Sequence, residues 1–369
     1  MKIVLLESFY GGSHEQWARA LQAYSKHEII ILSLPDKHWK WRMHGGAISL
    51  AKKFLEQNLE ADLILASDML DLNLFLSLTR SKSASIKTAI YFHENQLTYP
   101  WSPNDEDTKL KRDMHYAFIN VSSALSADKL FFNSAYHLNS FLNEVPNFLK
   151  VFPDFQELWI EDELKKKSEV LYLNLDLNEL IQAKPEQRIF HHRAVLLWNH
   201  RWEYDKNPEA FFQALFELQN RGVDFKLIVL GEERKYSPQI FTEAKLKLAD
   251  KILHWGFVNS RQEYAELLWQ ADILPVCSIQ DFFGASVVEA MACNVFPLLP
   301  HRLAYPEHLP AAYNETFLYN NMEDLVNRLQ RLIFDVSVLR KQDIQKWVMK
   351  YNWEQGIEAY DLAFDKILR

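Results

Sequence analysis

Two stretches in the second half of the sequence combine residue types that could hold a phosphorylated ligand. In the first, Arg201 and Lys206 precede a predicted helix that has Asn207 as a suitable N-cap and Pro208 as a suitable first residue. Two cations beside the free N–H groups of a helix start can clamp a diphosphate. We expect this role for Arg201 and Lys206, against the alternative of an ordinary surface arginine and lysine.

The second stretch, DFFGASVVEAM, begins at Asp281 and places Glu289 eight positions later. Ionised carboxylates only accept hydrogen bonds, which suits contacts with sugar hydroxyls. The backbone amides of residues 284–286 would then face a diphosphate. Ser286 and Glu289 also fit a helix capping box, so the spacing alone leaves a functional and a structural explanation of Glu289 open.

Glycine is scarce, with 9 in 369 residues or about 2.4%, where roughly 7% is usual. The pair Gly11-Gly12 lies between the first predicted strand and the first predicted helix, where a backbone without Cβ atoms can approach an anion. A plain tight turn is the alternative. His93 ends a buried-looking strand, so we expect either a catalytic or a structural histidine there.

Short apolar runs alternate with helical patterns along the whole chain, which is typical of βαβ units. Because the runs are continuously apolar, we expect parallel sheets covered on both faces. The predicted strands are residues 3–6, 29–32, 63–66, 89–92, 130–132, 170–175, 194–198, 225–230, 252–255, 273–276 and 295–299. Polar groups at Glu7, Asp68, His93–Asn95 and Asn133 end strands of the first half, at the edge where parallel sheets bind ligands.

The pattern predicts an α/β protein of two Rossmann-like domains, residues 1–181 and 189–350, whose parallel sheets face an interdomain cleft. The polar segment 182–188 (QAKPEQR) is interpreted as the linker. Residues 351–369 are expected to form a helix that packs back toward the first domain.

Composition narrows the class of protein further. The 41 Lys and Arg against 49 Asp and Glu give a net charge of −8, which disfavours a large nucleic-acid surface but leaves room for a local one. Cys277 and Cys293 have apolar neighbours and are expected to be buried free thiols. No apolar run approaches the ~18 residues of a membrane helix. We expect a cytoplasmic protein without an obligate protein partner.

Metal-binding patterns are weak. Asp105 and Asp107 have a D-x-D spacing but lie in a polar loop, and His191-His192 has no second ligand pair at zinc-like spacing. We therefore expect no metal and no cofactor.

Aromatic and basic residues alternate in Trp39-Lys40-Trp41-Arg42, as in a loop that stacks on bases and contacts phosphates. The two tryptophans could equally be core anchors. Arg112 lies on a predicted helix, residues 108–126, with further basic residues, and Lys165–Lys167 could form a second basic patch. A solvated helix face is the alternative for both.

The Arg201/Lys206 pair and the acidic element around Asp281 and Glu289 resemble the retaining GT-B glycosyltransferases, which include sucrose synthase and the phosphatidylinositol mannosyltransferases. This resemblance implies that the basic pair binds the donor diphosphate, that Glu289 binds the donor ribose and that residue 281 reaches the sugar hydroxyls. Asp281 stands where glutamate is usual in that group, so its shorter side chain extends less far toward the sugar.

A closer resemblance spans most of the chain. The segments ESFYGGSH, KHWKWR, YFHENQLTYP, FNS, HRWEYDKNPE, DFFG and YPE, which begin at residues 7, 37, 91, 132, 200, 281 and 305, are similar to the tRNA-queuosine α-mannosyltransferase group. This implies transfer of mannose from GDP-mannose to the queuosine base of a tRNA, with retention and without a metal. The nucleotide sugar and the tRNA are the expected partners.

The residue patterns and the resemblance together divide the expected site residues into three sets. The catalytic set is His93, Arg201, Lys206, Asp281 and Glu289. The donor-binding set is Gly11, Gly12, Arg201, Lys206, Phe283, Gly284, Ala285, Ser286 and Glu289. The acceptor-binding set is His14, Trp39, Trp41, Arg42, Asn95 and Arg112.

Three other functions remain open from the sequence. The first is a GT-B transferase with a small-molecule, lipid-linked or saccharide acceptor. The second is a GT-B-like sugar-nucleotide epimerase, which needs no acceptor. The third is a nucleotide-binding protein without catalysis.

Overall fold

The computed structural model describes residues 1–102, 107, 114–186, 188, 190–233 and 237–368. The chain forms two compact units, Met1–Asn174 with Trp353–Arg369, and Leu175–Asn352. The first unit ends at Asn174, before the expected boundary at residue 181, and it includes the C-terminal helix. The cleft expected between two domains stays a prediction.

The first unit contains a parallel sheet that, within the described residues, has the strand order β2-β1-β3-β4-β5-β6. Its strands are β1 (Lys2–Tyr10), β2 (Glu28–Pro35), β3 (Leu63–Ser67), β4 (Lys87–Phe92), β5 (Lys129–Phe132) and β6 (Ser168–Val170). Its helices are α1 (Gly12–Tyr24), α2 (Trp39–Glu56), α3 (Leu72–Ser83), α5 (His115–Ser126), α6 (Ala135–Leu149), α7 (Ile160–Lys167) and α17 (Trp353–Ile367).

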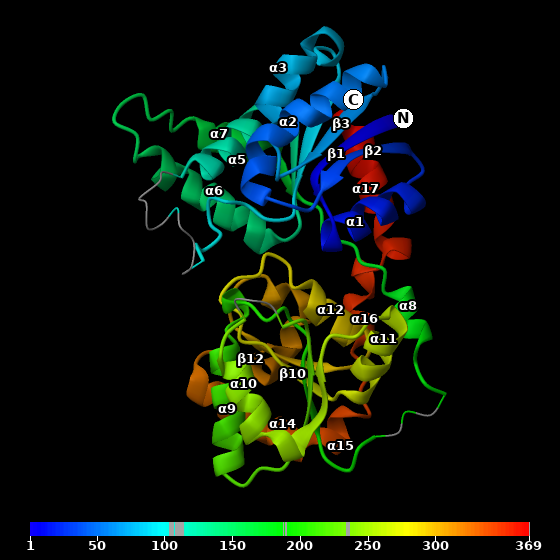
Figure 1. Ribbon diagram of the computed structural model, residues 1–369, viewed down its shortest axis with the longest axis vertical. Helices are drawn as coiled ribbons and strands as arrows, with labels where there is room; N and C mark the ends of the chain where they lie inside the picture. Colours follow the sequence, from blue (N-terminus) through cyan, green and yellow to red (C-terminus); the bar gives the residue numbers. More distant parts are fainter. Residues whose placement is uncertain (103–106, 108–113, 187, 189, 234–236, 369) are drawn as a thin grey trace. The chain divides into compact units, whose positions relative to one another are not determined.

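Side chains alternate between the two faces of this sheet, as the pleat requires. One face packs on α2, α3, α5, α6 and α7 through residues such as Leu6, Ile64 and Phe132. On the other face, Tyr91 stacks on Trp17 of α1 with ring centroids 4.6 Å apart, and Phe131 meets Phe364 of α17. Figure 1 shows the two groups of helices on opposite sides of the sheet. Both faces are therefore buried, which explains the continuously apolar strands.

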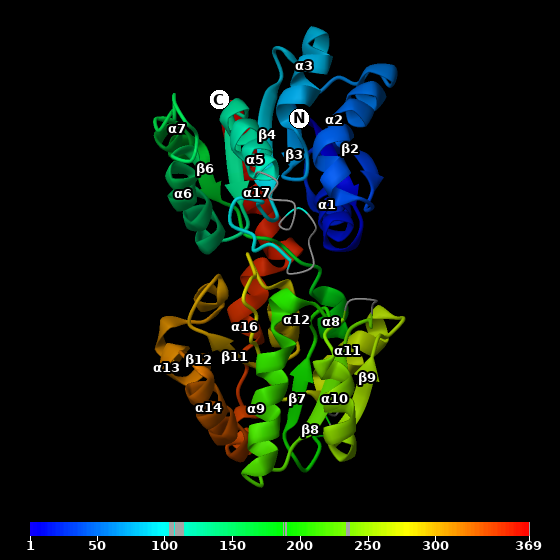
Figure 2. The ribbon, with the colours of Figure 1, turned by 60° about the vertical axis from the view of Figure 1, so that its left-hand side comes forward.

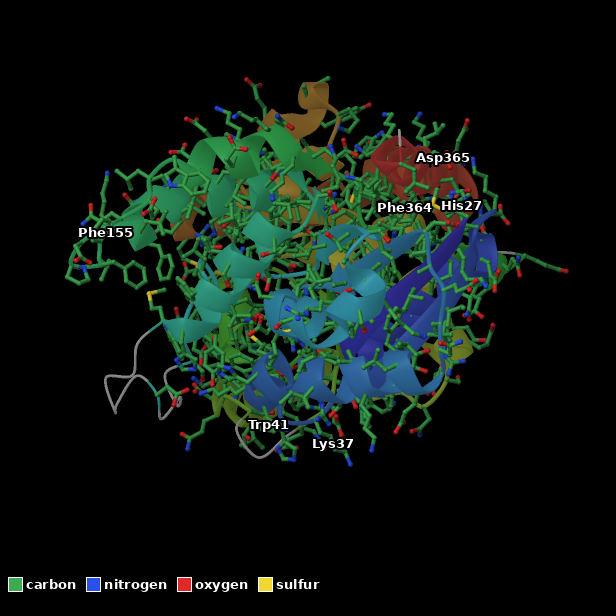
Figure 3. The ribbon with its side chains drawn as sticks, turned by 90° about the horizontal axis from the view of Figure 1, so that it is seen from above. His27, Lys37, Trp41, Phe155, Phe364 and Asp365 are labelled. Carbon is green, nitrogen blue, oxygen red and sulfur yellow. The ribbon has the colours of Figure 1, made fainter. Side chains whose placement is uncertain are left out.

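The C-terminal helix α17 completes the core of the first unit. The Tyr360 hydroxyl lies 2.9 Å from the Tyr91 hydroxyl and 3.3 Å from the indole nitrogen of Trp17. At the surface, the ammonium of Lys26 is 2.8 Å from the carboxylate of Asp365. Figure 3 shows Asp365 beside His27 at the edge of the unit, with the fully buried Phe364 next to them.

The second unit contains a parallel sheet with the order β12-β11-β10-β7-β8-β9 among the described residues. Its strands are β7 (Val195–Trp198), β8 (Lys226–Leu230), β9 (Ile252–Gly256), β10 (Ile273–Pro275), β11 (Phe296–Pro300) and β12 (Leu318–Tyr319). Its helices are α8 (Asn178–Gln182), α9 (Pro208–Asn220), α10 (Ile240–Lys247), α11 (Arg261–Gln270), α12 (Ala285–Ala292), α13 (Asn314–Phe317), α14 (Met322–Phe334), α15 (Val336–Leu339) and α16 (Gln345–Val348).

Aromatic packing anchors the second sheet to the helices on one of its faces. Trp198 at the end of β7 contacts Phe211 and Phe212 of α9 and Phe241 of α10, with ring centroids 5.0 to 6.2 Å apart. Figure 2 shows α9 and α10 in front of β7 and β8. This packing fixes the end of β7, from which the candidate site begins.

Two local expectations are wrong. The strand expected over residues 170–175 is the shorter β6, which ends at Val170. The segment Trp39–Arg42, expected as a loop or a strand, is the first turn of α2. The helix expected over 108–126 is confirmed from His115 onward as α5, and residues 108–113 lie outside the described residues.

Cys277 and Cys293 are buried free thiols, as expected from their apolar neighbours. Throughout the described part of the chain, we find no helix with the length and apolar character needed to cross a membrane.

Candidate functional site

The candidate site of the second unit forms where β7 and β10 end. After Trp198, residues 199–203 lead into a short 3-10 helix, Tyr204–Lys206, and then into α9. The side chain of Asn207 accepts a hydrogen bond from the amide of Ala210, and Pro208 is the first residue of α9, so both expectations for this helix start are confirmed. The left-handed Asn207 turns the chain so that Lys206 points back to the loop after β10.

Lys206 joins the two strand ends through three oxygens. Its ammonium lies 3.2 Å from a carboxylate oxygen of Asp205, 3.2 Å from Asp281 and 3.1 Å from the carbonyl oxygen of Gln280. The Lys206 side chain is 11% exposed, Asp281 16% and Asp205 fully buried. Two residues of the expected donor site, Lys206 and Asp281, are therefore in direct contact.

The electrostatics of this cluster favour the charged forms. Burial opposes the charge of Lys206, but Asp281 and Asp205 outweigh it and raise the pKa of the ammonium. Burial also opposes ionisation of Asp281, but Lys206 and further partners lower the pKa of that carboxyl. Tyr305 donates a hydrogen bond of 3.2 Å to the same Asp281 oxygen that Lys206 contacts. Lys206 is thus a fixed cation at the edge of the sheet.

Arg201 is the more exposed cation of the predicted pair. Its side chain is 59% exposed, and its guanidinium lies 3.2 Å from Glu203 and 3.8 Å from Asp205. Asp205 therefore contacts both Arg201 and Lys206, and it connects the two cations of the clamp.

Tyr305 and His308 pack against the turn between Asp281 and α12. Gly284 has φ of +92°, a left-handed conformation that disfavours any side chain, and a Cβ there would lie 3.1 Å from Tyr305. His308 contacts the carbonyl oxygen of the buried Phe283 at 2.6 Å, on the turn that leads to Gly284. Gly284 offers no side-chain cap to α12, which begins at Ala285, so the first amides of the helix are available to an anion.

Ser286 and Glu289 do not form the capping box that their spacing allowed. The hydroxyl of Ser286 lies 2.8 Å from Nδ1 of His200, and Glu289 instead accepts hydrogen bonds from Arg261 at 2.7 Å and from Tyr264 at 2.8 Å. Asn199 links the two contacts, because its amide nitrogen lies 2.8 Å from the Ser286 carbonyl oxygen and 3.2 Å from the Tyr264 hydroxyl. Glu289 is therefore held in place by α11.

In the first unit, the glycine pair lies where it was expected, between β1 and α1. Gly12 is the first residue of α1 and has φ of +54°. A Cβ at Gly11 would lie 2.2 Å from the carboxylate of Asp36, so the loop passes too close to that side chain for a larger residue.

His93 and His14 form a ring pair at the carboxyl ends of β1 and β4. Their ring centroids are 4.3 Å apart, and Nδ1 of His14 lies 3.1 Å from the carboxylate of Glu7. Burial opposes protonation of His14, but Glu7 outweighs it and raises the pKa of His14 to about 9. Burial and the charge of His14 lower the pKa of His93 well below its ordinary value. One ring is thus charged at neutral pH and the other is neutral.

Two polar atoms beside this pair are buried and have no hydrogen-bond partner within the described part of the chain. They are Nε2 of His93 and Nδ2 of Asn95, which follow β4. The neighbouring Asp68 accepts a hydrogen bond of 2.8 Å from the His93 amide, and burial raises the pKa of Asp68 to about 8. An acceptor hydroxyl could satisfy the unpaired atoms, and the expected role of His93 and Asn95 toward the acceptor stays a prediction.

The sequence patterns did not indicate the group of described residues that could hold a metal ion, which includes this pair. Asp107 of the D-x-D pattern, expected in a polar loop, is instead buried and forms an ion pair with Lys40. Ligand atoms of Glu7, His14 and His93 lie within 4.8 Å of one another, close enough to hold a metal ion. The Glu7 carboxylate also accepts hydrogen bonds of 2.9 Å from Ser67 and from the Phe9 amide. The same residues therefore serve equally well as a hydrogen-bonded acid–base chain.

The residues predicted to contact the acceptor differ in exposure. Trp41 is 61% exposed, whereas Trp39 is half-buried against Tyr116 with ring centroids 5.1 Å apart. Arg42 donates to the carbonyl oxygen of Pro35. Figure 3 shows Trp41 near Lys37 on one side of the first unit. Arg112 lies outside the described residues.

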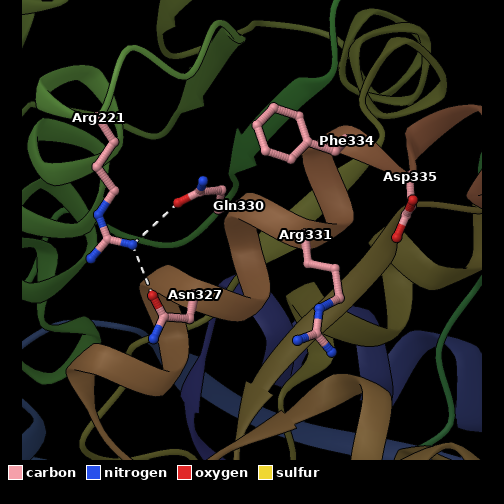
Figure 4. A pocket seen from close by; sticks show the side chains of 6 residues that line it. All are labelled: Arg221, Asn327, Gln330, Arg331, Phe334 and Asp335. Atoms are coloured by element: carbon pink, nitrogen blue, oxygen red, sulfur yellow. Dashed lines mark hydrogen bonds between the residues drawn. The ribbon is translucent and has the colours of Figure 1, made fainter.

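A groove of about 540 Å³ lies elsewhere in the second unit, between the ends of α9 and α14 (Figure 4). Arg221 of this groove donates hydrogen bonds to Asn327 and Gln330 at 2.8 and 3.1 Å. Because α9 starts beside Lys206, its far end lies roughly 20 Å away at the opposite edge of the sheet. No predicted site residue lines this groove.

Several site residues escaped sequence reasoning. Asp205 and His200 lie within the segment quoted for the resemblance, and their position after a strand could have marked them. Arg261 and Tyr264 contact Glu289 from a helix more than twenty residues away in the sequence, and nothing in their local sequence indicates this contact.

Comparison with known proteins identifies the family of the chain. Residues 2–175 match the family described as tRNA-queuosine alpha-mannosyltransferase N-terminal, and residues 181–345 match Glycosyl transferases group 1. A tRNA-queuosine alpha-mannosyltransferase from Drosophila melanogaster is 35% identical over 347 residues, which is 92% of this chain and 89% of the relative.

Solved structures share the fold at low identity. Sucrose-phosphate synthase from Thermosynechococcus elongatus has a TM-score of 0.72 at 14% identity and covers 100% of this chain and 99% of its own. A glycosyltransferase from Rickettsia africae has a TM-score of 0.69 at 17% identity, and the match covers 100% of this chain and 98% of that structure. The expected α/β architecture of the GT-B type is confirmed. The chain belongs to the tRNA-queuosine alpha-mannosyltransferase family of glycosyltransferases.

Proposed function

We propose that this protein transfers mannose from GDP-mannose to the queuosine base of a tRNA, with retention of the anomeric configuration. The observation that carries the proposal is the fixed cation Lys206, held between Asp205 and Asp281 where β7 and β10 end. The 35% identity to the Drosophila enzyme, spread over both units, supports the acceptor.

The second unit supplies what a leaving diphosphate needs. Lys206, the exposed guanidinium of Arg201 and the amides at the start of α12 all offer positive charge or N–H groups. Such preorganised donors stabilise the charge that builds on the leaving group, by roughly 3 kcal/mol each. This charge stabilisation is the task that a divalent cation performs in other transferases, so we propose that the reaction needs none.

The two carboxylates would bind the rest of the donor. Glu289, oriented by Arg261 and Tyr264, would accept hydrogen bonds from the ribose hydroxyls. Asp281, whose pKa is lowered, remains ionised at neutral pH and would accept from the sugar. Its contact with Lys206 would link the position of the sugar to that of the diphosphate.

Transfer would occur on one face of the sugar. The bond from the anomeric carbon to the phosphate oxygen breaks as the acceptor oxygen bonds to the same carbon, and a donor phosphate oxygen takes the acceptor proton. His93 is the group of the first unit best suited to orient the acceptor hydroxyl, because its Nε2 is buried and, in the described part of the chain, has no partner. Its low pKa keeps the ring neutral.

The deciding experiment supplies the purified protein with a tRNA that carries queuosine, or with the same tRNA carrying guanosine at that position. GDP-mannose and a panel of other sugar nucleotides are tested with each. Digestion and mass spectrometry should show a hexose increment on queuosine only with GDP-mannose. No hexose increment with any sugar nucleotide would refute the proposal, and conversion of the donor without tRNA would indicate an epimerase.

A matched pair of arginine variants tests the site itself. Arg201→Met should lower kcat/KM about 100-fold, as expected for loss of one charge-stabilising donor. Arg221→Met removes an arginine at the opposite edge of the same unit and should leave the rate unchanged. Full activity in the presence of EDTA is expected as well, and loss of activity that Mn²⁺ or Mg²⁺ restores would contradict the metal-free mechanism.

A further inference from the structure

His200 is the buried histidine of the second unit that the predicted site left unused. It is the second residue after the end of β7 and is 3% exposed. Its carbonyl oxygen accepts a hydrogen bond of 2.9 Å from the indole of Trp198, and the two rings meet edge to face at 5.2 Å. Nδ1 lies 2.8 Å from the Ser286 hydroxyl. Backbone and ring are therefore both held in one orientation.

The other ring nitrogen has no such contact. Nε2 of His200 is buried and has no hydrogen-bond partner within the described residues. A buried polar atom without a partner costs free energy, so an atom left in this state marks a place where a ligand completes the bonding.

The surroundings of His200 determine its protonation state. Burial, followed by the charge of Lys206, lowers the pKa of His200 to about 4, although Asp281 and Asp205 act in the opposite direction. The imidazole is therefore neutral at physiological pH and carries one proton. If the Ser286 hydroxyl donates to Nδ1, that proton resides on Nε2.

We propose that His200 is a third diphosphate-binding residue beside Arg201 and Lys206, and that it donates its Nε2–H to a phosphate oxygen of the donor. Ser286 would be a positioning residue that fixes this tautomer. The inference rests on the proposed function, because it takes a nucleoside diphosphate as the ligand. It adds a neutral donor to a cluster whose other side-chain donors are charged.

The location favours a phosphate over a sugar hydroxyl as the partner. His200 contacts Ser286 in the first turn of α12, the helix whose unsatisfied amides favour anions. It also lies close enough to Lys206 for that charge to depress its pKa. An N–H donor that lies beside both an ammonium and a helix start suits an anionic oxygen.

Three substitutions at position 200 separate this role from a structural one. His200→Gln places an amide N–H near the former Nε2. His200→Asn places a polar group near Nδ1 alone, and His200→Phe keeps the ring shape without either nitrogen. Binding of GDP and of guanosine is measured by isothermal titration for each variant, with His192→Gln, an exposed histidine ahead of β7, as the control.

We expect His200→Asn and His200→Phe to bind GDP at least tenfold more weakly than wild type, with guanosine binding unchanged. His200→Gln should bind GDP within about threefold of wild type. Ser286→Ala, which keeps the helix amide, should weaken GDP binding less than His200→Asn does. The control His192→Gln should match wild type with both ligands.

Two results would overturn the inference. Wild-type GDP affinity in His200→Asn would show that Nε2 makes no contact, and an equal loss for GDP and guanosine would show a structural role. Failure of the proposed donor gives a different result, because the wild-type protein itself would then bind no GDP.

Discussion

Replacing Lys206 with methionine should destabilise the protein as well as inactivate it. The substitution keeps most of the side-chain volume but removes the ammonium that contacts Asp205, Asp281 and the Gln280 carbonyl oxygen. Asp205 is fully buried and Asp281 is 16% exposed. Asp281 would lose its ammonium partner and Asp205 would keep the guanidinium of Arg201, 3.8 Å away, in a place that water hardly reaches.

The size of the effect follows from this burial. Removing one partner of a buried ion pair costs about 3–5 kcal/mol, a large part of the roughly 5–15 kcal/mol that stabilise a typical protein. For a domain of this size, 1 kcal/mol shifts the melting temperature by about 2–4 °C, so the second unit should melt about 6–20 °C lower. Turnover should fall by at least the 100-fold expected for one charge-stabilising donor.

A double-mutant cycle with Asp281→Asn isolates the ion pair. Urea unfolding of wild type, the two single variants and the double variant gives the coupling free energy, which we expect at about 1–3 kcal/mol. The lowered pKa of Asp281 means that its share of the stability is present above about pH 4 and is lost as the pH falls through the lower folded pKa. The raised pKa of Lys206 preserves the pair up to about pH 10.5.

The reasoning would be refuted by additive effects of the two substitutions at pH 7, or by a Lys206→Met variant as stable as wild type. Lys226→Met is the matched control. Lys226 starts β8 at the opposite end of the strands, and its ammonium donates an exposed hydrogen bond of 2.8 Å to the carbonyl oxygen of Asp250.

Tyr264→Phe removes one of the two groups that orient Glu289, so KM for the sugar nucleotide should rise about threefold to tenfold with little change in kcat. Glu7→Gln removes the carboxylate that raises the pKa of His14 to about 9, so the variant should be less stable than wild type by up to about 3 kcal/mol below pH 6.5. This difference should shrink as the pH rises from 6.5 through 9, which denaturant unfolding across that range measures. Trp41→Ala should leave unfolding within about 0.5 kcal/mol of wild type yet weaken tRNA binding about 5–150-fold, the range for loss of one base-stacking contact, measured by fluorescence anisotropy.

Each of these predictions has a result that contradicts it. If Tyr264→Phe lowered kcat without changing KM, Glu289 would not be a donor-binding residue. If the stability difference between Glu7→Gln and wild type grew as the pH rose, Glu7 would not be stabilising a protonated His14. If Trp41→Ala bound tRNA as tightly as wild type, Trp41 would be an ordinary surface residue. The control is Phe334→Ala, which removes an exposed aromatic side chain in the groove of Figure 4.

The sequence predicts the fold well because its strands are buried on both faces. A continuous apolar run such as residues 63–66 or 295–299 has few alternatives to a central parallel strand, and helix-start chemistry at Asn207-Pro208 is local enough to be read directly. The two-residue strand β12 carries no such signal, and it is defined by its pairing with β11 alone.

The candidate site is predicted only where its chemistry lies in neighbouring residues. Lys206 and Asp281 were recognisable from helix starts and strand ends, and the structure brings them to 3.2 Å. The spacing of Ser286 and Glu289 left a capping box open because that is a local rule, whereas the partners of Glu289 come from α11. Trp39 and Trp41 were ambiguous because alternation of aromatic and basic residues also fits the first turn of a helix.

The return of α17 to the first sheet has a consequence for biosynthesis. Trp17, Tyr91 and Phe131 emerge from the ribosome early, but Tyr360 and Phe364, which cover them, are made last. Residues 175–352 are translated in between, which takes about 10–35 s at ordinary elongation rates. During that interval an aromatic surface stays uncovered on the nascent chain. We therefore expect the first unit to mature only after release and to depend on chaperones until then.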